Sequence, residues 1–283
     1  QYVGMGMDLA EAFPQAREVF EKADQVLGFS LSQLCFQGPQ EKLKQTQNSQ
    51  PAILTMSLAA YEAFKAHCGF GFKVPAYCAG LSLGEYSALV CAGALSFEDA
   101  VYLVRKRGEF MEEEAQKKPG RMLSVIGLDL AAARQVCVLA HTEIANRNCP
   151  GQIVLSGGVD EIEQAKITAK ELGAKMTIQL EVSGAFHSSF MRQASLRLAQ
   201  ELDKIKIRPL AVPVVCNVTG NVLSSEVEIK DNLVKQVFSS VLWEDSTKFM
   251  LSKGIKHFIE FGPGSVLKGL MRRTDALAKV ASM

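Results

Sequence analysis

The sequence predicts an α/β protein in which a small β-α-β-β-α-β unit is inserted into a larger, sheet-containing part. Two observations lead to this prediction. A short apolar run at residues 74–79 precedes a glycine-bracketed turn and the start of a helix, which is the order of elements in an α/β sheet. Between residues 120 and 185, strand-like and helix-like patterns follow the order of a ferredoxin-like unit. A chain of 283 residues that is 48% hydrophobic can bury at least one large core around these elements.

Apolar spacing and turn residues predict the elements that precede the insertion. In chain order, we predict helices over 8–36 and 52–67, a strand over 74–79, a turn over 80–84 and a helix from Glu85. Ser96 with Asp99 resembles a capping box. This pair therefore opens a further helix, which ends within residues 117–120.

The inserted unit and the segment after it are predicted in the same way. Within the insertion we predict strands over 122–127, 144–146, 152–156 and 175–181, with helices over 130–141 and 159–172. After it we predict helices over 189–202, 229–238 and 245–253, strands over 212–217 and 257–261, and a closing helix from Ser265. We therefore divide the chain into a discontinuous large domain, residues 1–119 and 186–283, and a small domain, residues 120–185.

Composition excludes several classes of function. The 31 Lys and Arg residues nearly balance the 30 Asp and Glu residues, which argues against a general nucleic-acid binder or a disordered tail. The seven cysteines are scattered and contain no C-x-x-C pair, so we expect reduced thiols in a cytoplasmic protein, with no disulfide framework and no metal site. No apolar run approaches the roughly 20 residues of a membrane span, so we expect a soluble protein.

Ser82 is the candidate nucleophile. It lies in Gly80-Leu81-Ser82-Leu83-Gly84, a G-x-S-x-G sequence between a predicted strand and a predicted helix. Such a turn exposes the serine hydroxyl at the helix N-terminus, where the Leu83 amide is placed to receive a developing oxyanion. The alternative is a turn of small residues in which Ser82 only caps the helix from Glu85.

His187 is the candidate general base among the four histidines. His67 and His141 lie at the ends of amphipathic helices, and His257 begins an apolar strand, so these three have structural explanations. His187 lies in a loop of small residues between a predicted strand and a predicted helix, where reactive groups are commonly held. The alternative is a histidine that caps the helix from Ser189.

Arg107 lies at the edge of the apolar stripe of its helix, whereas Lys106 points away from that stripe. One interpretation is an arginine whose stem packs on the core while its head reaches water. The other is a planar guanidinium directed into a cleft, where it can bind a substrate carboxylate through two hydrogen bonds.

Five motifs together resemble those of the malonyl-CoA:acyl carrier protein transacylases, in the order and at the spacings of that family. They are Ala79-Gly80-Leu81-Ser82-Leu83-Gly84-Glu85-Tyr86-Ser87-Ala88, Arg107-Gly108, Asn146-Arg147-Asn148-Cys149-Pro150-Gly151-Gln152-Ile153-Val154, Val182-Ser183-Gly184-Ala185-Phe186-His187-Ser188 and Glu260-Phe261-Gly262-Pro263-Gly264. The similarity covers essentially the whole chain.

The resemblance implies an α/β-hydrolase-like large domain with a parallel sheet and an inserted ferredoxin-like domain. It also implies a ping-pong transfer of malonyl from malonyl-CoA, through Ser82, to the phosphopantetheine thiol of acyl carrier protein. His187 matches the family's base and Gln236 the residue whose backbone carbonyl orients it. Arg107 matches the arginine that binds the malonyl carboxylate, and Phe186 would crowd a branch at C2. Leu81 and Asn148 match the substrate pocket, and no cofactor is implied.

The chain departs from the family's pattern at a few positions. Leu81 stands where a histidine usually precedes the nucleophile, and Ser189 and Ser240 stand where prolines are expected. The family begins with a strand and a glutamine that supplies a second oxyanion donor, and we expect this chain to start just after them, at Gln1.

Two alternatives to the transferase remain. An esterase or thioesterase of related fold would not need Arg107 at the acyl end. A catalytically weak carrier-docking module of a larger synthase would be consistent with the absent N-terminal motif. For the transferase we expect a monomer that binds malonyl-CoA and acyl carrier protein but neither nucleic acid nor membrane, with both fatty acid and polyketide carriers open as acceptors.

Overall fold

A computed structural model describes residues 1–283 and has a mixed α/β fold. Two pairs of strands are parallel. β1 (Cys78–Ala79) pairs with β6 (Val214–Val215), and β7 (His257–Glu260) pairs with β8 (Lys279–Ser282). The predicted α/β class, with a parallel sheet, is therefore confirmed.

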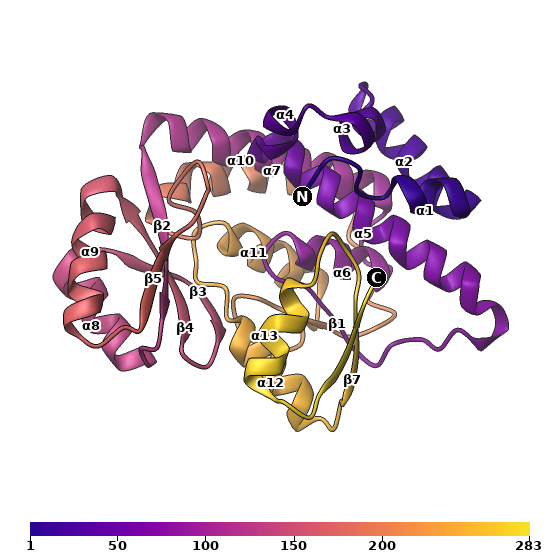
Figure 1. Ribbon diagram of the computed structural model, residues 1–283. Coiled ribbons are helices and arrows are strands. Elements are labelled where there is room, and N and C mark those ends of the chain that lie inside the picture. The colour runs from indigo at the N-terminus through magenta and orange to yellow at the C-terminus, as the bar shows by residue number, and fades with distance from the viewer.

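A four-stranded antiparallel sheet lies at one end of the molecule, on the left of Figure 1. Four strands and two helices make up this end of the molecule; in chain order they are β2 (Gly120–Ile126), α8 (Leu130–Ala140), β3 (Glu143–Cys149), β4 (Gln152–Gly158), α9 (Val159–Glu171) and β5 (Met176–Gln179). The strand order in the sheet is β3-β4-β2-β5. Leu123 and Leu155 face each other across β2 and β4 and belong to a fully apolar core with side chains of both helices. The six elements follow the chain order predicted for this segment.

The remaining elements are mainly helical and surround the larger core. They are α1 (Met7–Ala12), α2 (Pro14–Leu27), α3 (Leu31–Gln37), α4 (Gln40–Lys44), α5 (Thr46–Cys68), α6 (Gly84–Cys91), α7 (Phe97–Lys117), α10 (Arg192–Leu202), α11 (Glu226–Gln236), α12 (Trp243–Ser252) and α13 (Val266–Thr274), with short 3₁₀ turns at Gly69–Gly71 and Ser189–Met191. None of the helices combines the length and apolar character that a membrane-spanning helix requires.

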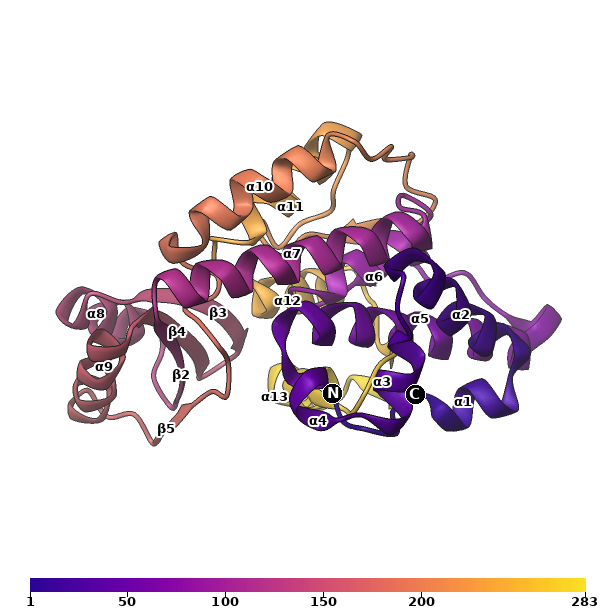
Figure 2. The ribbon, with the colours of Figure 1, turned by 90° about the horizontal axis from the view of Figure 1, so that it is seen from above.

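The long helix α7 runs across the molecule beside α10 and α5 (Figure 2). Ser96 caps it by accepting a hydrogen bond from the Asp99 amide at 3.0 Å, as its sequence predicts. Gly108 allows close contact with α5, because a Cβ there would lie 2.7 Å from the carbonyl oxygen of Thr46. This close approach brings side chains of α5 next to the middle of α7.

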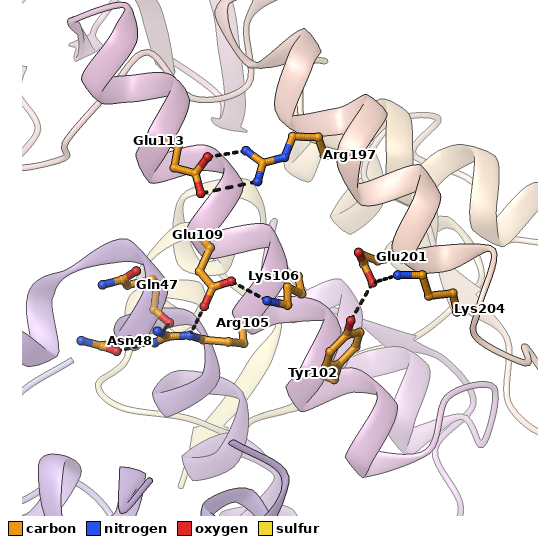
Figure 3. Close-up of polar contacts among 10 residues, drawn as sticks. All are labelled: Gln47, Asn48, Tyr102, Arg105, Lys106, Glu109, Glu113, Arg197, Glu201 and Lys204. Atoms are coloured by element: carbon orange, nitrogen blue, oxygen red, sulfur yellow. Dashed lines mark hydrogen bonds and ion pairs between the residues drawn. The ribbon is translucent and has the colours of Figure 1, made fainter. Parts of the chain in front are cut away.

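Polar contacts join the outer side of α7 to its neighbours (Figure 3). The hydroxyl of Tyr102 donates to Glu201 on α10 at 2.6 Å, and Arg197 of α10 pairs with Glu113 of α7. These groups are partly exposed, so water already solvates them in part. The apolar contacts beneath them therefore supply most of the attraction between α7 and α10.

Several elements of the structure differ from those predicted. The helix expected over 8–36 is three helices, because Pro14 starts α2 and Gly28, with φ 71°, ends it. The strands expected over 74–79 and 212–217 shorten to the two-residue β1 and β6, since Pro75 and Pro213 have no N–H to donate to a strand ladder. The exposed strand β8 was not predicted, because its two apolar residues give little periodicity.

Candidate active site

Ser82 lies in a strained turn between β1 and α6. Its φ of 52° falls in the left-handed region, which residues other than glycine seldom adopt. A Cβ at Gly80 would lie 2.1 Å from the carbonyl of Gly84, so the tight turn requires glycine there. The Ser82 side chain does not cap α6, and its hydroxyl instead contacts His187 and Arg107. The capping interpretation of Ser82 is therefore wrong.

Asn217 fixes the backbone of this turn. It follows β6, the parallel neighbour of β1, and is fully buried. Its Oδ1 accepts a hydrogen bond from the Ser82 amide at 2.5 Å, and its Nδ2 donates to the carbonyl oxygen of Gly80 at 2.8 Å. One side chain thus satisfies two backbone groups of the turn.

His187 is oriented as a base toward Ser82. Its Nε2 lies 2.8 Å from Ser82 Oγ, and its Nδ1 lies 2.8 Å from the backbone carbonyl oxygen of Gln236. A carbonyl can only accept, so Nδ1 carries the proton and the lone pair of Nε2 faces the serine hydroxyl. Ser188, not His187, caps the short helix that follows. The capping alternative for His187 is therefore wrong as well.

The pKa of His187 supports a neutral imidazole. Burial and the nearby charge of Arg107 lower this pKa to about 4, against the opposing effect of hydrogen bonds with the backbone of Gln236 and Ser239. At neutral pH the imidazole is therefore uncharged, with Nε2 free to accept the serine proton.

Arg107 is buried beside the nucleophile, with only 2% of its surface exposed. Its Nη2 donates to Ser82 Oγ and to Gln236 Oε1, both at 3.1 Å, and its Nη1 donates to Gln50 Oε1 of α5 at 2.6 Å. Burial lowers its pKa from the usual arginine value. The interpretation of a head in water is therefore wrong. Every hydrogen-bond acceptor of this cation is an uncharged oxygen.

The other predicted site residues form no hydrogen bond with Ser82, His187 or Arg107. Leu83 is the N-cap of α6, and its amide donates no hydrogen bond within the protein. Leu81 packs in an apolar cluster with Trp243, and half-buried Phe186 packs against the main core. Asn148 lies at the end of β3 with a buried, unpartnered Oδ1, and it forms no hydrogen bond with Ser82 or the groups that contact it.

The serines that replace expected prolines also have defined contacts. Ser189 donates from both its amide and its hydroxyl to Glu143, and the hydroxyl of Ser240 donates to the carbonyl oxygen of Ile144. Both acceptors belong to β3. These serines thus attach the His187 loop and the segment after α11 to the antiparallel sheet, through bonds that a proline could not make.

The sequence did not single out Gln50, Glu85 or Asn217, although all three contact the reacting group or its partners. Each carried a weak signal. Glu85 is an acid in the first turn of an otherwise apolar helix. Asn217 ends the strand predicted over 212–217, and ligand-binding residues of parallel sheets occur at such strand ends. Gln50 directly precedes an apolar helical stretch. None of these patterns reveals a partner.

A pocket of about 590 Å³ opens beside His187. Its lining includes Arg134 and Val138 of α8, Glu143 of β3 and Phe238 after α11. Its lining includes neither Ser82 nor Arg107. No set of three or more His, Cys, Asp or Glu side chains is arranged to hold a metal ion.

Comparison with known proteins identifies related chains. The family model described as "Acyl transferase domain" matches residues 1–282. The malonyl CoA-acyl carrier protein transacylase of Bacillus subtilis is 46% identical over 100% of this chain and 90% of its own length. The enzyme of that name from Escherichia coli K12 is 42% identical over 96% of this chain and 89% of its own length.

Solved structures agree with these sequence relatives. An acyl carrier protein S-malonyltransferase from Vibrio cholerae superposes with a TM-score of 0.95 at 38% identity, covering 100% of this chain and 93% of its own. A malonyl-transacylase in complex with a type II polyketide synthase acyl carrier protein superposes with a TM-score of 0.96 at 38% identity, covering 100% and 92%.

Proposed function

Because this chain belongs to the acyl transferase domain family, we propose that it transfers a malonyl group from malonyl-CoA to the phosphopantetheine thiol of acyl carrier protein through an ester of Ser82. The observation that carries the choice of acyl group is the buried cation of Arg107, 3.1 Å from Ser82 Oγ. One methylene separates the malonyl carboxylate from the thioester carbon. A cation next to the nucleophile therefore suits this short acid.

The first half-reaction forms the acyl-enzyme. His187 Nε2 removes the proton from Ser82 Oγ as this oxygen attacks the thioester carbon of malonyl-CoA. The Leu83 amide, free of any protein acceptor, donates to the oxyanion. When the intermediate collapses, the bond from carbon to sulfur breaks, and the CoA thiolate takes the proton from His187.

The second half-reaction repeats these steps with another thiol. His187 removes the proton from the phosphopantetheine thiol, whose sulfur attacks the ester carbon. The bond from that carbon to Ser82 Oγ breaks, and the oxygen recovers its proton from His187. In both halves the Gln236 carbonyl holds the imidazolium in place through Nδ1–H at 2.8 Å, the role that an acidic side chain has in other triads.

Arg107 favours this transfer over the hydrolase alternative. An esterase that acts on a neutral acyl group does not need a buried cation without an ion-pair partner, and burying such a cation is costly. The assembled contacts of Ser82 and His187 likewise argue against a weak docking module, which does not need an oriented base.

Several finer assignments form part of the proposal. The strand order β3-β4-β2-β5 with two helices supports a ferredoxin-like small domain over 120–185, and the turn of Ser82 supports an α/β-hydrolase-like large domain over 1–119 and 186–283. Phe186, Leu81 and Asn148 are proposed to line the acyl pocket. The steps above use only side chains and backbone, so we propose that the transfer needs no cofactor. The free cysteines support our proposal of a cytoplasmic protein, and we propose that it is a monomer.

Intact-mass measurement tests the proposed function. Mixing the protein with malonyl-CoA should add one malonyl group, and later addition of phosphopantetheinylated acyl carrier protein should remove it. Ser82→Ala should abolish the adduct, whereas the control Ser252→Ala, at an exposed hydroxyl on α12, should retain it. An adduct that persists at full yield in Ser82→Ala would refute the assigned nucleophile. Release of CoA without an adduct would favour the hydrolase.

A further inference from the structure

Glu85 is a fully buried acid directly behind the reacting groups. It lies in the first turn of α6 and forms no ion pair. Its Oε2 accepts hydrogen bonds from Gln236 Nε2 at 2.6 Å and from the Asn217 amide at 3.2 Å, while its Oε1 has no side-chain or backbone donor at hydrogen-bond distance. Burying a carboxylate without a cationic partner is costly, so its retention here requires an explanation beyond stability.

The two groups that donate to Glu85 are those that hold the site together. Gln236 supplies the carbonyl that orients His187, and its Nε2 also donates to the carbonyl oxygen of Ser82 at 3.0 Å. Asn217 accepts the Ser82 amide through Oδ1. Glu85 thus touches neither Ser82 nor His187 through its side chain, but it contacts both residues that fix them.

The orientation of the Gln236 amide depends on the charges at its two ends. Its Oε1 accepts from the Arg107 guanidinium, and its Nε2 donates to the Glu85 carboxylate. Arginine can only donate and a carboxylate can only accept. Rotating the amide by 180° would therefore place Gln236 Nε2 against the N–H groups of Arg107 and Gln236 Oε1 against the carboxylate oxygen of Glu85. A cation and an anion at opposite ends leave a single favourable orientation.

From these contacts we propose that Glu85 is a positioning residue for the acyl transfer: through Gln236 and Asn217 it fixes Ser82, His187 and Arg107 in their reactive arrangement. This inference rests on the proposed function for its substrate, but the arrangement itself can be probed with a reagent that any activated serine accepts.

The negative charge of Glu85, which orients the Gln236 amide, is only partly present at neutral pH. Burial raises its pKa to about 7, against the effects of the hydrogen bonds from Gln236 and Asn217, the nearby thiol of Cys216 and the charge of Arg107 from α7. Besides Arg107, the titratable groups that face it are Tyr86 of its own helix and the thiol of Cys216 at the end of β6. Burial raises the pKa of Cys216 to about 12 and also raises that of Tyr86. Both groups therefore stay protonated and uncharged at neutral pH.

Two substitutions at Glu85 separate positioning from folding. Glu85→Leu removes the acceptor, and misplacement of reacting groups by about 1 Å costs on the order of 10²-fold in rate. Glu85→Gln keeps an acceptor oxygen but removes the charge, so it should recover most of this loss and leave a deficit of about three- to tenfold. The matched control is Glu114→Gln, at a buried acid on α7 outside the site that pairs with Lys117.

The measured quantity is the rate of modification of Ser82 per molecule able to react. Unfolded molecules, which do not react, are thereby left out of the comparison. Intact mass gives the rates of acylation by malonyl-CoA and of sulfonylation by phenylmethanesulfonyl fluoride, and steady-state transfer gives kcat and KM. Glu85→Leu should slow both modifications about 10²-fold or more and lower kcat far more than it changes KM. Glu114→Gln should match the wild-type chain in both modification rates and in kcat and KM.

Two results would overturn the positioning role: a Glu85→Leu rate within about threefold of wild type per reactive serine, or a Glu85→Gln rate as low as that of Glu85→Leu. Failure of the proposed function has a different signature, because a wild-type chain that reacts with the sulfonyl fluoride but not with malonyl-CoA would refute the substrate alone. The sulfonylation series would still test Glu85.

Discussion

Arg105 and Arg107 lie two residues apart on α7, yet their surroundings differ in kind. Arg105 pairs with Glu109 at 2.6 Å and also donates to the backbone of Gln47 and the side chain of Asn48 (Figure 3). Its side chain keeps 21% of its surface exposed. Arg107 is buried and donates only to two amide oxygens and the hydroxyl of Ser82.

The difference shows which arginine has a structural role and which one can bind a substrate anion. Glu109 neutralises Arg105, whose hydrogen bonds then join α7 to α5. Arg107 donates hydrogen bonds to three uncharged oxygens and forms no ion pair. The Glu85 carboxylate contacts it only through Gln236, so Arg107 retains a strong attraction for an anion that enters the site. Of two arginines on one helix, the buried one without an acid is therefore the one suited to a substrate carboxylate.

Replacing Arg107 by alanine should give the largest effect. In Arg107→Ala the malonyl carboxylate enters a partly desolvated site with no cation, and such losses at buried charge pairs amount to about 2–5 kcal/mol. We expect acylation by malonyl-CoA to fall on the order of 10²-fold or more, while acylation by acetyl-CoA falls much less. Arg105→Ala, the matched control, should stay within about threefold for both substrates. Equal losses for the two substrates in Arg107→Ala would make this arginine purely structural.

The pH dependence of acylation should sharpen the comparison, because the charge of Arg107 also acts on His187. Transfer needs the neutral imidazole, and the pKa of His187 is lowered to about 4 by burial and by Arg107. The kcat/KM for malonyl-CoA should therefore fall by no more than about three- to tenfold between pH 8 and about 5, as Glu85 takes up a proton and loses its charge. It should decline steeply only below that, as His187 becomes protonated.

Removing the cation should move this decline. Without Arg107 the protonated imidazole is less disfavoured, so its pKa rises, and the acidic decline of Arg107→Ala with acetyl-CoA should lie at higher pH than that of the wild-type chain. Arg105→Ala should leave the decline in place. An unchanged profile in Arg107→Ala would show that burial alone determines the pKa of His187.

The smallest effect is expected at the partly exposed contact between α10 and the C-terminal half of α7. Arg197 pairs with Glu113 and lies 4.0 Å from the ring centre of Phe110, with 38% of its side chain exposed. Exposed ion pairs contribute about 0–1 kcal/mol, so Arg197→Ala should lower the free energy of unfolding by about 1 kcal/mol or less in urea titrations. Acylation per reactive serine should not change. A loss above about 3 kcal/mol would indicate that this pair anchors α10 to α7.

Local patterns in the sequence determined much of this protein. The glycines around Ser82 specify the tight turn, Ser96 specifies the start of α7, and alternating apolar residues specify the strands between residues 120 and 179. These features depend on residues a few positions apart, which is why the sequence shows them directly. For the same reason it also identified Ser82, His187 and Arg107 as candidates, each by its own motif.

Only the tertiary structure decided what these candidates contact. Ser82 and His187 are 105 residues apart, and the burial of Arg107 follows from the approach of α5 at Gly108 and of Gln236 from α11. The amphipathic pattern of α7 left the head of Arg107 equally consistent with water and with the interior. Gln50, Glu85 and Asn217 had no local pattern that indicated a partner. The free energy of a buried polar group depends on which distant donors and acceptors surround it, and packing of remote segments determines that environment.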